Sequence, residues 1–143
     1  MQLEIYLQET ERLAAKHQNV LLEISDQIKI NDELGTIEEQ AMLHSVQVVI
    51  ENAIGKARHL LKMHNKKVPV SVYDLFEDLK ANGFINHQDL NQWKKVIGLR
   101  NTIVHEYMKV DVELLKKVIL EKQYKFVLQF LKKPFDRFLV SSK

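Results

Sequence analysis

Residues 36–63, TIEEQAMLHSVQVVIENAIGKARHLLKM, decide the fold, because their apolar side chains recur at helical spacing throughout the stretch. Thr36 and Glu39 form the Thr-x-x-Glu pattern of a capping box, which predicts that the helix begins here. The side chains predicted to face inward are Met42, Val46, Val49, Ile50, Ala53, Ile54, Ala57, Leu60 and Leu61. Such a broad apolar side needs other helices to cover it.

Residues 2–29 form a second long predicted helix, with an apolar residue at every seventh position. These positions are Leu7, Ala14, Leu21 and Ile28. His17 falls on the same seam, where a buried and hydrogen-bonded histidine is more common than a ligand. The pattern therefore predicts two long helices that pack along each other.

The rest of the chain also follows helical patterns, with residues 64–70, HNKKVPV, as a loop. Three further helices are predicted: from Ser71 to Asn82-Gly83, from Asn86 or His87 to about Tyr107, and from Asp111 to Pro134. Each begins at a side chain that can cap free N–H groups. The sequence thus predicts an all-α protein, an antiparallel four- to five-helix up-and-down bundle, with residues 1–143 as one domain.

Composition supports this class and excludes several others. Apolar residues make up 45% of the 143 residues, with only four glycines and two prolines. The absence of cysteine excludes disulfides and thiolate metal sites and fits a cytoplasmic protein. The N-terminus, MQLEIYLQETERL, is acidic and amphipathic, unlike a secretory signal. No charge-free apolar run approaches the roughly 20 residues that span a bilayer.

The net charge of +2 is unevenly distributed along the chain. Residues 1–62 carry ten acids and six bases, whereas residues 63–143 carry nine acids and fifteen bases. The basic half includes four lysine pairs, Lys66/Lys67, Lys94/Lys95, Lys116/Lys117 and Lys132/Lys133. Such a half can attract nucleic acid or another anionic partner, or it can be a solvated helix surface.

Residues 98–111, GLRNTIVHEYMKVD, concentrate groups that can handle a phosphate or a proton. Asn101 and His105 are four residues apart and share one side of the predicted helix. Arg100 lies about 140° from His105 on the helix but is long enough to reach its side, so the two would flank one groove. The alternative is that Asn101 and His105 satisfy each other and nearby backbone groups inside the bundle.

Other familiar site motifs are missing from the sequence. His59 and His64 are five residues apart, which is not a metal-ligand spacing. There is no glycine-rich phosphate loop, nucleophile elbow, His-Glu-x-x-His motif or acidic pair suited to two metal ions. The sequence therefore predicts neither a metal site nor a cofactor.

The segment RNTIVHEY fits the pattern Arg-x4-His-x-Tyr and resembles the HepT-like group of the HEPN superfamily. The flanking residues of GLRNTIVHEYMKVD and the segment IENAIGKARHLL in the second helix are similar to that family too. The order of helices agrees over nearly the whole chain. One departure is Gly55-Lys56, where the family often has an aspartate.

The resemblance implies a metal-independent ribonuclease toxin of a toxin–antitoxin pair, acting as a homodimer whose two motifs face a shared cleft. It implies that Arg100, Asn101 and His105 form the catalytic set, in which Asn101 orients His105 or the phosphate. The lysines near the motif, Lys94, Lys95 and Lys109, would then attract the RNA backbone.

The resemblance also implies a partner, a minimal nucleotidyltransferase that acts as antitoxin by adding AMP to the motif tyrosine, Tyr107. A competing hypothesis is a non-catalytic helical partner, or a substrate- or nucleotide-binding subunit, of such a nucleotidyltransferase. A third is an interaction bundle without a site.

Overall fold

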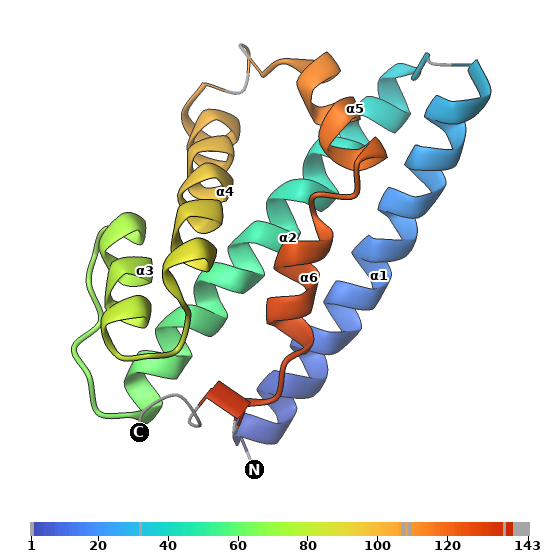
Figure 1. Cartoon of the computed structure of the whole chain (residues 1–143). Helices are drawn as coiled ribbons and strands as arrows, with labels where there is room; N and C mark the ends of the chain where they lie inside the picture. The colour runs from blue at the N-terminus through green and yellow to red at the C-terminus, as the bar shows by residue number, and fades with distance from the viewer. Residues whose placement is uncertain (1, 32, 107, 109, 136, 139–143) are drawn as a thin grey trace.

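The computed structural model describes residues 2–31, 33–106, 108, 110–135 and 137–138. Within these ranges the chain forms six helices and no strand (Figure 1). The helices are α1 (Gln2–Asn31), α2 (Thr36–Met63), α3 (Val72–Ala81), α4 (His87–His105), α5 (Val112–Leu120) and α6 (Lys125–Lys132). None of the helices in the described ranges is long and apolar enough to cross a bilayer.

Four of these helices, α1, α2, α4 and α6, run alternately up and down (Figure 1). Helix α2 contacts α1, α4 and α6, so it occupies the centre of the bundle. The short helices α3 and α5 lie in the connections, with α3 packed on α4 and α5 packed on α1. The predicted all-α, antiparallel up-and-down bundle is confirmed.

The last predicted helix is in fact two helices, which corrects the count. Lys122 adopts a left-handed backbone conformation, with φ 55°, just after the end of α5. The N–H of Lys122 donates to the Ile119 carbonyl, and the N–H of Gln123 donates to the Val118 carbonyl. These two bonds form a Schellman ending, which usually has a glycine at the left-handed position. A lysine there gives no such signal in the sequence.

The predicted capping box at Thr36 is wrong. Helix α2 takes Gly35 as its N-cap, and no side chain bonds the first N–H groups. A capping box occurs instead at the start of α4, between Asn86 and Asp89. The predicted cap at Ser71 is confirmed, since its hydroxyl accepts from the Asp74 N–H at 3.4 Å.

The core matches the predicted apolar patterns closely. All nine residues predicted to face inward on α2 are buried. His17 is buried as well, and its Nδ1 lies 2.9 Å from the Ser45 hydroxyl, so it is the hydrogen-bonded core histidine that was predicted. Helices α1 and α2 therefore pack as the sequence indicates, and α4 packs against α2.

Lys56 is fully buried in this core. Its ammonium donates to the carbonyls of Phe130 at 2.6 Å and Leu131 at 3.0 Å, and also to the Lys133 carbonyl. These carbonyls belong to the C-terminal end of α6, where backbone acceptors have no partner within the helix. The rings of Phe130, Phe135 and Phe138 surround the same ammonium at 5.3–5.5 Å. Lys56 thus fastens the end of α6 to α2.

Replacing Lys56 with methionine should lower the free energy of unfolding by about 2–3 kcal/mol at neutral pH, because carbonyls at the end of α6 lose their donor. Burial lowers the pKa of Lys56 to about 8, with Glu11 opposing and Lys133 reinforcing this effect. Above that pH the folded chain releases a proton that the unfolded chain still holds, so stability from this group rises with pH. Urea unfolding at pH 7 and 9.5 measures both effects.

Lys62→Met, at an exposed lysine of the same helix, is the matched control and should change stability little. The advantage of wild type over Lys56→Met should grow between pH 7 and pH 9.5. An equal or smaller advantage at the higher pH would contradict the assigned environment of Lys56.

Candidate active site

Arg100 lies on the C-terminal half of α4 and reaches toward α2. Its Nε donates to Glu51 Oε2 at 2.8 Å, and one terminal nitrogen donates to Asn101 Oδ1 at 3.0 Å. The Arg100 side chain is 20% exposed and the Glu51 side chain is 38% exposed. An ion pair this exposed to solvent adds only about 0–1 kcal/mol to the stability of the fold, so its main effect is to fix the direction of the Arg100 guanidinium. Two of the five N–H donors of Arg100 are used, and three remain.

His105 is the last residue of α4 and is exposed. No hydrogen bond joins its ring to the part of the chain that the structure describes, so Asn101 and His105 do not satisfy each other. Asn101 instead accepts from Arg100. Because Asn101 and His105 are one helical turn apart, the fixed arginine and the accessible imidazole belong to the same end of α4.

The candidate lysines separate on two sides of α4. Lys94 shares a stripe with Gly98, Asn101 and His105, and it pairs with Glu77 of α3 at 3.1 Å. Lys95 faces the other way and lines a hollow between α4 and the α5–α6 side of the bundle. Lys109 and Tyr107 lie outside the described residues.

The structure adds Glu51, which the motif alone did not identify as a site residue. Glu51 and Arg100 are 49 residues apart, so only the packing of α2 on α4 joins them. The segment IENAIGKARHLL contains Glu51, and its family likeness was the available signal.

The departure at Gly55-Lys56 falls elsewhere on α2. Gly55 faces the Tyr6 hydroxyl, which would lie 3.4 Å from a Cβ atom placed there. Lys56 is occupied with the end of α6, as described above. Among the described residues, the carboxylate that reaches Arg100 is that of Glu51, which lies one helical turn before Gly55.

A phosphate near this end of α4 would meet complementary chemistry. The remaining guanidinium N–H groups can donate to phosphate oxygens, and the exposed imidazole is of a kind that can accept or donate a proton. Within the described ranges, no group of three or more histidine, aspartate or glutamate side chains is arranged to hold a metal ion. Beneath this site Ile97 and Ile103 of α4 are buried, whereas Val104 is 37% exposed.

Comparison with known proteins gives two sequence relatives of note. The chain is 29% identical to the mRNA nuclease HepT of Shewanella oneidensis over 84 residues, which is 59% of this chain and 62% of that protein. The match thus spans less than two thirds of that nuclease. A protein of Archaeoglobus fulgidus is also 29% identical, over 136 residues that make up 95% of each chain.

A solved structure and a family model give the same family as these sequence relatives. The fold is similar to that of the tri-AMPylated HEPN toxin of Shewanella oneidensis, solved in complex with MNT antitoxin. That match has a TM-score of 0.74 and 20% sequence identity, and it covers 88% of this chain and 93% of the toxin. The family model described as ribonuclease HepT-like matches residues 10–134, a range that includes Glu51, Arg100, Asn101 and His105. The chain therefore belongs to the ribonuclease HepT-like family.

Proposed function

We propose that this protein is a cytoplasmic, metal-independent endoribonuclease toxin of a toxin–antitoxin pair. The observation that carries the proposal is the end of α4, where Glu51 and Asn101 hold Arg100 and His105 stands exposed one turn further on. Family membership and the nuclease name of the Shewanella relative support the same reaction.

RNA supplies its own nucleophile, so the protein needs only to move protons and stabilise charge. His105 accepts the proton of a 2′-hydroxyl, whose oxygen forms a bond to the adjacent phosphorus. The bond from phosphorus to the 5′-oxygen breaks, and a second acid protonates that oxygen. The products are a 2′,3′-cyclic phosphate and a 5′-hydroxyl. Arg100 neutralises the charge that builds up on the phosphoryl oxygens.

The lysines and Asn101 have supporting roles in this proposal. Asn101 orients Arg100 through their hydrogen bond, and so acts on the phosphate indirectly. Lys94 extends the His105 stripe toward the middle of α4 and, with Lys95 and Lys109, attracts the RNA backbone. Glu51 is a positioning residue, because it contacts Arg100 and not the substrate.

The second acid is supplied by a second copy of the chain in a homodimer. One chain places one exposed motif histidine at this end of α4, whereas general acid and general base are needed together. In the dimer, the 98–108 segments of two copies face each other across the cleft. Val104 and Met108, which are 37% and 86% exposed, provide apolar surface for that contact.

Light scattering should therefore give twice the 16.8 kDa chain mass at micromolar concentration. Val104→Glu should shift the protein toward the monomer, because it places a charge in the apolar contact. Ile5→Glu is the matched control, since Ile5 is 63% exposed and lies near the start of α1, at the other end of the bundle from the end of α4 (Figure 1). A wild-type monomer at these concentrations would remove the shared active site from the proposal.

Regulation comes from a partner nucleotidyltransferase, the antitoxin, which adds AMP to Tyr107. The Shewanella HEPN toxin of similar fold is tri-AMPylated and was solved with an MNT antitoxin, which supports this part of the proposal. Each added AMP carries a negative phosphate and a bulky base next to Arg100 and His105 in the sequence. Such a group would compete with RNA for the guanidinium and block access.

Incubation of the purified, unmodified protein with RNA in EDTA tests the proposed function. Cleavage that leaves 2′,3′-cyclic phosphate ends is the expected result. Cleavage that requires an added metal ion, or equal cleavage by wild type and a His105 variant, would favour a non-catalytic partner protein with a contaminating nuclease.

A further inference from the structure

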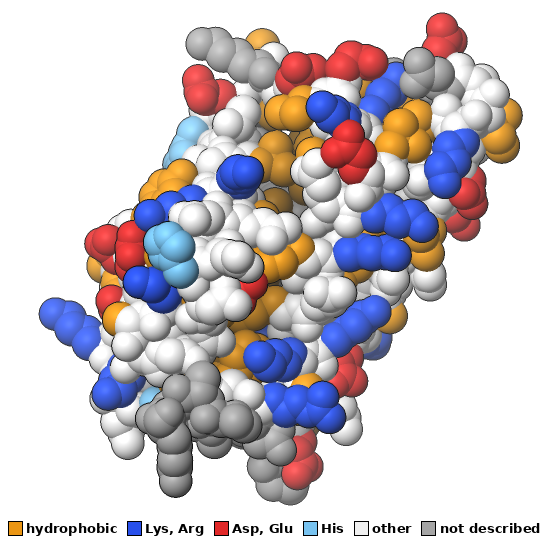
Figure 2. Space-filling model, viewed as in Figure 1, with side chains coloured by type: hydrophobic (Ala, Val, Ile, Leu, Met, Phe, Trp, Pro, Cys, Tyr) orange, Lys and Arg blue, Asp and Glu red, His pale blue; other side chains and the backbone are white. Residues whose placement is uncertain are grey.

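A long hollow opens between α4 and the α5–α6 side of the bundle, here called the α4–α6 groove (Figure 2). Its volume is about 580 Å³, and Val46, Val49 and Ile50 of α2 form its floor. Helices α4 and α6 meet through the ring of Trp93, which contacts Phe126 and Phe130. Above that contact the two helices diverge (Figure 1), and the residues that line the groove lie on both sides of this gap.

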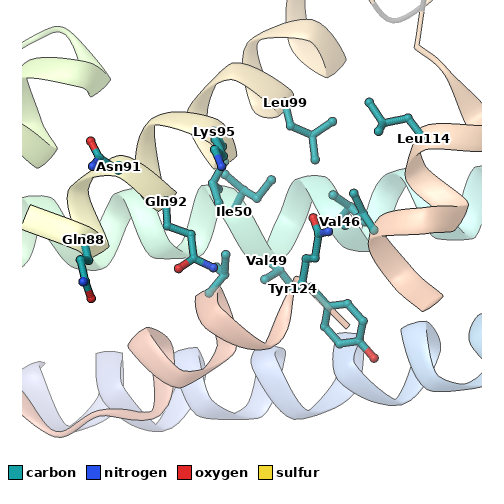
Figure 3. Close-up of a pocket in the computed structure, with 14 residues that line it drawn as sticks. Val46, Val49, Ile50, Gln88, Asn91, Gln92, Lys95, Leu99, Leu114 and Tyr124 are labelled. Carbon is teal, nitrogen blue, oxygen red and sulfur yellow. The ribbon is translucent and has the colours of Figure 1, made fainter. Parts of the chain in front are cut away.

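Helix α4 contributes one wall of the groove as a straight row of side chains. Gln88, Gln92, Lys95 and Leu99 follow one another at spacings of four, three and four residues, which forms a straight stripe along the helix. The stripe is about 16 Å long, or three helical turns. On the opposite wall, Leu114 and Val118 are one turn apart, and Figure 3 shows Leu99 and Leu114 pointing toward each other across the groove.

The groove has an apolar floor and a polar part of its α4 wall, where Lys95 supplies one positive charge. The floor and the upper walls are valine, isoleucine and leucine, whereas Gln88, Gln92 and Lys95 project from the lower part of the α4 wall (Figure 3). No aspartate or glutamate lines it among the described residues. Lys95 is thus the one charged side chain among the described residues that line it. A complementary occupant has an apolar stripe beside carboxylates.

We infer that the α4–α6 groove binds an amphipathic α-helix of another protein, with apolar residues at i, i+3/i+4 and i+7 and acidic residues beside them. Grooves between helices with an apolar floor recognise partner helices in this way. A nucleic-acid strand fits poorly, because its phosphates would lie over an apolar floor and only one lysine would meet them. This inference does not depend on RNA cleavage.

The described part of this chain offers no helix of the required kind. Its exposed large apolar residues are Ile5, Leu22 and Ile30 on α1, Ile37 and Met63 on α2, and Leu114 and Leu120 on α5, besides those on α3, α4 and the loops. On no helix do three of them share one side at i, i+3/i+4 and i+7 spacing. A second copy of the chain therefore does not supply the helix, and a different protein does.

The groove also adjoins the candidate active site. Ile50 on the floor and Leu99 on the wall immediately precede Glu51 and Arg100 in their helices. A helix seated in the groove would press on the contact between α2 and α4 that brings this ion pair together. Binding there would thus affect the position of the Arg100–Glu51 pair without covering the exposed His105 side chain.

A designed, fluorescein-labelled peptide of about four helical turns tests the inference on the full chain. It carries leucines at i, i+3, i+4 and i+7 and glutamates on the flanks, and a matched peptide carries lysines in place of the glutamates. Fluorescence anisotropy should show that the glutamate peptide binds at least about tenfold tighter. Equal binding of the two peptides would overturn the predicted acidic partner.

Two variants locate the binding. Leu114→Glu, at a residue that is 50% exposed, should weaken the glutamate peptide at least about tenfold, and Lys95→Glu should reverse the preference between the two peptides. Lys117→Glu, at an exposed lysine outside the groove, is the matched charge control and should change binding little. If Leu114→Glu leaves the affinity for the glutamate peptide unchanged, the peptide binds elsewhere and the assignment is overturned.

Two further measurements separate the other occupants. The mass of Leu114→Glu by light scattering should equal that of wild type. A change in mass would mean that the groove is a contact between copies of this chain. AMP, added as a competitor, should leave the peptide bound, and displacement by AMP would assign the groove to a small ligand instead. Circular dichroism confirms that each variant is folded.

Discussion

His105→Ala should lower the rate of RNA cleavage in EDTA by at least about 100-fold, the usual scale for removing a general acid or base. The side chain is exposed at the end of α4, so its loss removes a proton carrier without opening a cavity in the core. His87→Ala is the matched control, because His87 is an exposed histidine at the opposite end of the same helix. Equal losses in the two variants would show that the effect is not specific to the motif.

Arg100→Ala should cost a similar factor, because the phosphoryl oxygens lose their charged donor. Arg12→Ala removes an arginine from another Arg–Glu pair, at the exposed surface of α1, and should leave cleavage unchanged. Glu51→Gln keeps an oxygen that can accept from Arg100 but loses the charge, so we expect a smaller loss than for Arg100→Ala. Single-turnover assays under saturating RNA distinguish these losses of rate from losses of binding.

Glu51→Gln also separates positioning from stability. The Arg100–Glu51 pair is partly exposed and contributes little to folding, so urea unfolding of this variant should match wild type within about 1 kcal/mol. A large loss of stability with unchanged cleavage would show that Glu51 is a structural residue and would remove it from the proposed mechanism.

The regular parts of the fold could be predicted because local spacing determines them. The nine inward residues of α2 recur at helical intervals and are all buried, and His17 occupies the seam on α1 where a core histidine was expected. The break after α5 could not be predicted in this way. Lys122 takes a left-handed conformation that is usual for glycine or asparagine, so its residue type gives no sign of the helix ending there.

The site was predictable to the extent that its residues are close in sequence. Arg100, Asn101 and His105 share the C-terminal half of α4, as the spacing indicates. The carboxylate that pairs with Arg100 belongs to Glu51, 49 residues earlier in the chain. The ammonium that donates to the end of α6 belongs to Lys56, 74 residues before Phe130. Helical periodicity gives the direction of a side chain but not its partner on another helix, so both contacts required the structure.

Tyr107→Phe should abolish transfer of AMP to this protein by its nucleotidyltransferase partner, because the phenolic oxygen is the proposed acceptor and phenylalanine lacks it. Wild-type protein incubated with the partner, ATP and Mg²⁺ should gain mass in steps of one adenylate, and its RNA cleavage should fall as the steps accumulate. Intact-protein mass spectrometry gives the number of steps. The variant should keep its mass and nearly all of its cleavage, since the proposed mechanism assigns no proton transfer to Tyr107.

Tyr73→Phe is the matched control, because Tyr73 is 40% exposed at the start of α3 and offers the partner another accessible hydroxyl. This variant should gain adenylates as wild type does. If Tyr107→Phe accepts adenylates normally, the modified residue lies elsewhere and this account of regulation fails. If Tyr107→Phe stays unmodified but modified wild type still cleaves RNA, AMP transfer occurs at Tyr107 without acting as the off switch. The inhibition would then require the partner itself to stay bound, because one phosphate charge beside Arg100 and His105 in the sequence would have proved too weak to exclude RNA.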